Sequence, residues 1–158
     1  MVPDSIEREV RIDAPVDVVW RVVTEPDQIT QWFSDRAELE LREGGDGVLT
    51  FLNEGTEYQP VVAPLVVVRA EAPHAFAYRW SHPEGTRADG SNSVLVEFTL
   101  RPDGDGTLLR VVESGVAAMA WTDAAKTRYL EDHRHGWDQH LGDLRTYAAR
   151  VAATPAAR

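Results

Sequence analysis

The 158-residue sequence contains no cysteine, which excludes disulfides, thiol catalysis and zinc–thiolate sites. Basic residues are scarce, with 16 Lys and Arg against 26 Asp and Glu, so the net charge is −10. An acidic surface repels phosphate groups, and we therefore expect neither nucleic acid nor an anionic membrane as a partner. No apolar run approaches the ~20 residues of a membrane helix, and residues 1–10 lack the apolar core of a signal peptide. These absences predict a soluble protein of the cytoplasm.

The length predicts one domain over residues 1–158, with an ordered core at about 6–150. The sequence shows neither an internal repeat nor a stretch with the composition of a linker. The tail Ala152–Arg158 is typical of a frayed end.

Periodicity predicts the first elements. Residues 6–12 alternate apolar and charged side chains, as in a strand with one wet face. A helix is expected after Pro15, where the spacing of apolar residues makes one stripe. Thr24 is a candidate N-cap for a second short helix, whose apolar face would hold Ile29, Trp32 and Phe33.

From residue 37 to 115 the pattern changes to about six strands separated by turns, including a polar loop at Ser81–Asn92 and a hairpin turn at Asp103–Gly106. A long helix follows, capped by Thr122. Its apolar stripe comprises Leu130, Trp137, Leu141, Leu144, Ala148 and Val151. This order predicts an α+β fold in which the helix covers the apolar face of a curved antiparallel sheet.

Several short motifs occur in an order that resembles one family. They are Ile12-Asp13-Ala14-Pro15, Gln31-Trp32-Phe33, Tyr78-Arg79-Trp80, Glu113-Ser114-Gly115 and Gly136-Trp137. Over residues 6–150 the chain resembles the activator-of-heat-shock-protein-90-ATPase homologue family, within the START-like, birch-pollen-allergen-like (SRPBCC) superfamily. The resemblance implies a helix-grip fold: a curved seven-stranded antiparallel sheet around a long C-terminal helix, two short helices after the first strand, and a hydrophobic cavity between sheet and helix.

The resemblance identifies the fold better than the activity, because function depends on sites carried by a fold. Eukaryotic chaperone activators of this family have a separate N-terminal domain that makes much of the chaperone contact. This sequence starts directly at the expected first strand. This counts against chaperone activation, while a homodimer would be in keeping with the superfamily.

Alternation and helical spacing place a set of aromatic, apolar and polar side chains around the expected cavity. An apolar pocket with a few converging polar groups is the usual form of a small-molecule site. The alternative is that the same side chains fill the core completely. The candidates are Trp32, Phe51, Phe76, Tyr78, Trp80, Val96, Phe98, Val111, Glu113, Tyr129, His133, Trp137, His140 and Leu141.

Glu113 is the most informative candidate. If the alternation of its strand holds, its carboxylate points inward and needs a partner or a raised pKa. Its place at the strand end, near Gly115, instead favours a side chain that reaches solvent. His133 and His140 lie on the inner side of the final helix but about 10 Å apart along its axis, too far to bind one metal ion together. We therefore predict no metal and no cofactor.

Three hypotheses for function follow. The first is a protein that binds a small apolar or aromatic molecule without a cofactor. The second is a cofactor-free enzyme on the same scaffold, such as a cyclase or dehydratase, with Glu113, His133 and His140 as candidate acid–base residues. The third is a protein-interaction module or chaperone co-regulator.

Overall fold

The computed structural model describes residues 4–81 and 92–154. The polar loop expected over Ser81–Asn92 and the last part of the tail Ala152–Arg158 fall mainly outside these residues. The helices are α1 (Val16–Thr24), α2 (Pro26–Ile29) and α3 (Asp123–Ala153), with a 3₁₀ turn η1 (Val116–Ala118). The strands are β1 (Ser5–Ile12), β2 (Arg36–Leu39), β3 (Asp46–Phe51), β4 (Val61–Glu71), β5 (Ala75–Ser81), β6 (Ser93–Asp103) and β7 (Gly106–Ser114).

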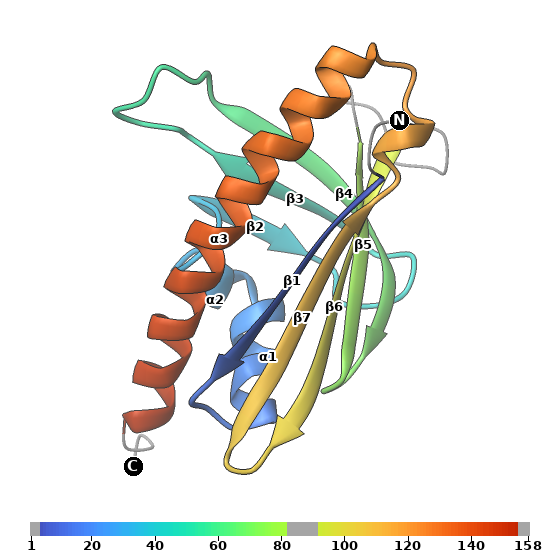
Figure 1. Ribbon diagram of the computed structural model, residues 1–158. Coiled ribbons are helices and arrows are strands. Elements are labelled where there is room, and N and C mark those ends of the chain that lie inside the picture. Colours follow the sequence, from blue (N-terminus) through green and yellow to red (C-terminus); the bar gives the residue numbers. More distant parts are fainter. Residues whose placement is uncertain (1–3, 82–91, 155–158) are drawn as a thin grey trace.

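The seven strands form one antiparallel sheet in the order β1-β7-β6-β5-β4-β3-β2. The sheet curves, and α3 runs across its concave side while α1 and α2 lie beside the lower half of the helix (Figure 1). The helix packs on β1 and α1. This arrangement confirms the predicted α+β helix-grip fold. Within residues 4–81 and 92–154, no helix is long and apolar enough to cross a membrane.

The ends of α3 and the face that it buries follow from its sequence. The hydroxyl of Thr122 accepts a hydrogen bond from the backbone N–H of Ala125 at 3.1 Å, so the predicted cap is confirmed. The apolar stripe of the helix is buried at Leu130, Trp137, Leu141, Leu144 and Ala148. Burial of this stripe against the sheet is what holds so long a helix in place.

The prediction that Thr24 caps the second helix is wrong. Thr24 is instead the last residue of α1, and its hydroxyl donates to the carbonyl oxygen of Trp20 at 2.7 Å. Glu25 takes the N-cap position of α2. Because α2 already ends at Ile29, Trp32 and Phe33 lie in the turn that follows it.

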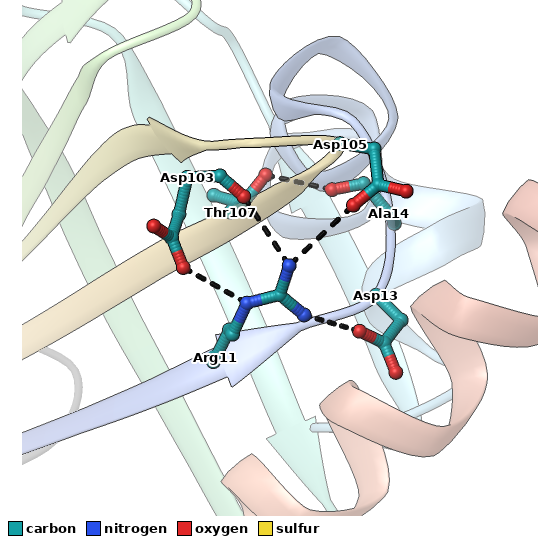
Figure 2. A network of polar contacts seen from close by, with 6 residues as sticks. All are labelled: Arg11, Asp13, Ala14, Asp103, Asp105 and Thr107. Carbon is teal, nitrogen blue, oxygen red and sulfur yellow. Dashed lines mark hydrogen bonds and ion pairs between the residues drawn. The ribbon is translucent and has the colours of Figure 1, made fainter.

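A charged cluster joins the end of β1 to the β6–β7 hairpin (Figure 2). The Arg11 guanidinium donates to the carboxylates of Asp13 and Asp103, the latter at 2.8 Å, and lies 3.5 Å from Asp105. Gly106 makes room for it, since a Cβ there would lie 2.7 Å from that guanidinium and 2.8 Å from a backbone carbonyl oxygen. We refer to Arg11, Asp13, Asp103 and Asp105 as the Arg11 cluster.

Candidate functional site

Glu113 is fully buried on the inner face of β7, with 0 % of its surface exposed. The inward-pointing alternative is therefore the right one, and the interpretation in which Glu113 reaches solvent is wrong. The alternation of β7 continues to the end of the strand: Thr107, Leu109, Val111 and Glu113 are all buried. The first turns of α3 cover this strand end, which keeps water away from the carboxylate.

Three side chains of α3 donate to this one carboxylate. Tyr129 donates from its hydroxyl at 2.5 Å, His133 from Nδ1 at 2.9 Å and Trp137 from its indole nitrogen at 2.9 Å. The donors are four residues apart, so they lie on one face of the helix. We refer to Glu113, Tyr129, His133 and Trp137 as the Glu113 cluster.

The cluster keeps Glu113 ionised in spite of its burial. Burial raises the pKa of Glu113, but the hydrogen bond and charge of His133, with the bonds from Tyr129 and Trp137, outweigh it and leave the pKa below its ordinary value of 4.5. His133 is 28 % exposed, so this side chain connects the buried carboxylate to the surface. The site is thus a buried negative charge whose donors come from a single helix.

Aromatic rings enclose this cluster and continue toward β3. The Trp137 ring stacks on Phe33 at 5.5 Å, and Phe33 in turn meets Phe51 edge-to-face at 5.3 Å. The rings of Tyr129 and His133 are stacked at 3.7 Å, and Trp80 meets His133 edge-on at 6.0 Å. The interior is therefore lined with apolar and aromatic surface, as in small-molecule sites.

The interior is largely filled by side chains. A void of about 10 Å³ remains, roughly room for one water molecule. Its walls are formed by Val23, Ile29, Trp32, Phe33, Leu39, Leu49, Leu65, Phe76, Tyr78 and Phe98. The implied cavity between sheet and C-terminal helix is thus displaced: in the described chain the void lies between the sheet and the α1–α2 region, because the rings of α3 occupy the space beside it.

Two donors in this interior have no hydrogen-bond partner among residues 4–81 and 92–154. They are the hydroxyl of Tyr78 and the indole nitrogen of Trp80, on side chains 2 % and 6 % exposed. Both side chains point inward from β5, and their rings are 5.6 Å apart. Burial raises the pKa of Tyr78 well above its ordinary range, and the charge of Glu113 raises it further.

His140 is separate from the Glu113 cluster. Its ring meets Phe33 edge-to-face at 4.9 Å and lies 6.5 Å from Phe51. Burial lowers the pKa of His140 below 6.5, although the backbone of Trp32 and the charge of Asp143 act in the opposite direction. Its Nδ1 is buried without a partner in the part of the chain that the structure describes. The two candidate histidines therefore do not form one site.

The remaining candidates fall into two groups. Phe76, Val96, Phe98, Val111 and Leu141 are buried side chains of the hydrophobic core. The indole of Trp32 donates to the carbonyl oxygen of Val22 at 2.9 Å, which holds the turn after α2 against α1. No group of three or more His, Asp or Glu side chains within the described ranges could hold a metal ion.

Phe33 is a site residue that the sequence pattern does not indicate. This ring lines the void and touches the rings of Trp32, Phe51, Trp80, Trp137 and His140. Its position next to Trp32 was a usable signal, but a helix through residue 33 was expected where the chain makes a turn. Within that turn Phe33 stays partly exposed while it reaches the interior.

A seven-stranded sheet closed around a long C-terminal helix, with a polar cluster buried between them, defines a START-like helix-grip protein. The family model described as Activator of Hsp90 ATPase homolog 1-like protein matches residues 13–149, and the chain belongs to this family. The resemblance stated from sequence is therefore confirmed.

Solved structures agree on the fold. MLL2253 from Mesorhizobium loti is similar at 22% identity and a TM-score of 0.73, covering 93% of this chain and 98% of its own. CalU16 from Micromonospora echinospora is similar at 28% identity and a TM-score of 0.64, covering 93% and 77%. DynU16, a protein in the dynemicin biosynthetic locus, is similar at 23% identity and a TM-score of 0.70, covering 95% and 49%. No curated protein matches the sequence.

Proposed function

We propose that this protein binds a small apolar or aromatic molecule inside the curved sheet, in the region bounded by β2–β6, α1 and α2. The observation that carries this proposal is the phenol of Tyr78, buried on the wall of an apolar void without a partner in residues 4–81 and 92–154. A buried polar group without a partner costs free energy, and native proteins leave few of them. A ligand in the void would supply the hydrogen-bond partner that the Tyr78 hydroxyl lacks.

The void itself is smaller than any such guest, so binding requires side chains to move. Phe33 is suited to move because it lies in a turn, is partly exposed, and separates the void from Phe51 and His140. Movement of this ring would join the void to the protein surface. The Glu113 cluster would stay in place, since its hydrogen bonds tie α3 to β7.

Native mass spectrometry of the freshly purified protein, followed by denaturing extraction, tests this proposal first. We expect a bound small molecule, or binding of an added apolar fluorescent probe that changes the tryptophan emission. Leu65→Phe fills the void from β4 and should weaken probe binding, whereas Val62→Phe on the same strand, 46 % exposed, should not. Equal binding by the two variants, or an empty protein that takes up no probe, would contradict the proposal.

A second function, a cofactor-free enzyme of cyclase or dehydratase type, is favoured by one contact. The Glu113 carboxylate accepts a hydrogen bond from Nδ1 of His133 at 2.9 Å. In the neutral ring this bond leaves Nε2 without the proton, which is the form a general base needs. Under this proposal His133→Gln retains probe binding but loses turnover of a polyketide-like substrate. Unchanged turnover in that variant would eliminate the role of His133.

A further inference from the structure

The two unpartnered donors of β5 limit what the guest can be. Tyr78 and Trp80 are alternate residues of one strand, and each offers one proton to the interior. Both side chains are more than nine-tenths buried. A ligand that uses both protons must bring a hydrogen-bond acceptor.

The neighbouring polar groups do not meet this need. The single proton of the Tyr129 hydroxyl goes to Glu113. Burial and then Glu113 raise the pKa of Tyr129, while the N–H of Trp80 acts in the opposite direction, so the indole nitrogen lies near that hydroxyl. The two atoms nevertheless do not reach hydrogen-bond geometry among the described contacts. An acceptor for these two donors is therefore the missing part of this wall.

The charge of that acceptor is limited by Glu113. This carboxylate is ionised and near enough to Tyr78 to act on its titration. Within residues 4–81 and 92–154, the basic side chain that contacts this carboxylate is His133, and it is already bonded to Glu113. A second carboxylate would lose its hydration and meet a like charge with no cation left for it, which is unfavourable in a buried site.

We propose that the ligand presents a neutral carbonyl oxygen, as in an aromatic ketone, to the Tyr78 hydroxyl and the Trp80 indole N–H. This inference rests on the ligand-binding function proposed above. A carbonyl oxygen has two lone pairs and can accept from both donors. The aromatic rings around the void then contact the apolar part of the same molecule, and carboxylates of similar size are rejected.

Three probes of similar size and shape test this preference. They are a ketone, a hydrocarbon and a carboxylate: 2-acetylnaphthalene, 2-isopropylnaphthalene and 2-naphthoate. Binding of each to the full chain is measured by calorimetry. We expect the ketone to bind roughly tenfold more tightly than the hydrocarbon, because only the ketone satisfies the donors. The carboxylate is expected to bind most weakly of the three.

The variants Tyr78→Phe and Trp80→Phe each remove one donor and keep a ring. Each should reduce the ketone-to-hydrocarbon affinity ratio about threefold to tenfold while leaving hydrocarbon binding in place. Tyr147→Phe is the matched control, because that hydroxyl donates to Gln28 at 2.5 Å, outside the Glu113 cluster, and the ratio should stay unchanged. Thermal melts check folding, and we expect no loss of stability in Tyr78→Phe since no described partner is lost.

The outcomes separate this inference from the function on which it rests. Equal affinities for ketone and hydrocarbon, tighter binding of 2-naphthoate, or a ratio that survives either donor variant would overturn the carbonyl inference and leave ligand binding intact. Failure of all three probes to bind would overturn both. That last result is the one expected if the void holds only a water molecule.

Discussion

The Arg11 cluster and the Glu113 cluster stand at opposite ends of the β1–β7 ladder, where Ile12 pairs with Thr107 and Ile6 with Glu113. Each surrounds one charged group with several partners of opposite polarity. At one end a guanidinium with a side chain 42 % exposed meets acidic side chains. At the other a carboxylate with 0 % exposure meets Tyr, His and Trp donors from a helix.

The difference shows that burial, not the number of partners, decides how much such a cluster contributes to the stability of the fold. Exposed ion pairs gain little, because water and salt screen them and long side chains lose freedom. A buried charge needs hydrogen-bond partners for all its polar atoms. Removal of either the charged group or its partners leaves the remaining polar groups unpaired in an apolar interior. The Arg11 cluster therefore fastens a loop, whereas the Glu113 cluster determines where α3 lies on the sheet.

The largest effect is expected from Glu113→Ala. It leaves Tyr129 and Trp137 without their acceptor and opens space beside them, so we expect a loss of about 3–5 kcal/mol in the free energy of unfolding. Urea denaturation measures this loss. Glu7→Ala, which breaks an exposed ion pair with Arg110, is the control and should cost less than about 1 kcal/mol. Similar losses in the two variants would contradict the comparison.

Tyr129→Phe is expected to cost about 2 kcal/mol, because the hydrogen bond that it removes goes to a charged acceptor. Denaturation in urea is again the measurement. Tyr147→Phe removes a bond between neutral groups and should cost less, which makes it a control on the same helix. A loss in Tyr129→Phe no greater than in Tyr147→Phe would show that the charge of Glu113 adds nothing.

A smaller effect is expected in acid. Because the pKa of Glu113 is lower in the folded protein than its ordinary value of 4.5, the stability due to ionised Glu113 is complete above about pH 4.5. It is lost as the pH falls from there through the folded-state pKa. The stability difference between wild type and Glu113→Gln should thus shrink in this range, as followed by urea denaturation at several pH values. A difference that stays constant down to pH 3 would contradict the lowered pKa.

Arg11→Met should have the smallest effect, a slight loss of stability that disappears in about 1 M salt, where charges are screened within roughly 3 Å. The loss in Glu113→Ala should persist at the same salt concentration, because its carboxylate is shielded from solvent. Thermal melts of both variants at low and high salt make this measurement. A salt-independent loss in Arg11→Met would mean that packing rather than charge holds this cluster.

The fold could be predicted because its signals are local and repeated: alternation along β7, the stripe of α3 and the cap at Thr122. The inward face of Glu113 followed from the same alternation. Its burial did not, since the sequence does not tell how far α3 extends over the end of β7. Phe33 was missed because helical spacing does not distinguish a helix from the turn that follows one. The size of the void depends on the packing of side chains from α1, α2, the turn after α2 and β2–β6, which no local pattern records.

The four-residue spacing of Tyr129, His133 and Trp137 also makes the length of α3 part of the site. Each residue advances an α-helix by about 100°, so one residue inserted between Tyr129 and Trp137 would turn one of them away from Glu113. An insertion before Thr122 would change only the connection to η1. Related chains that keep this buried carboxylate should therefore vary in length before the helix and not between Tyr129 and Trp137. Relatives with an insertion or deletion between the positions of Tyr129 and Trp137 would be those that have lost the site.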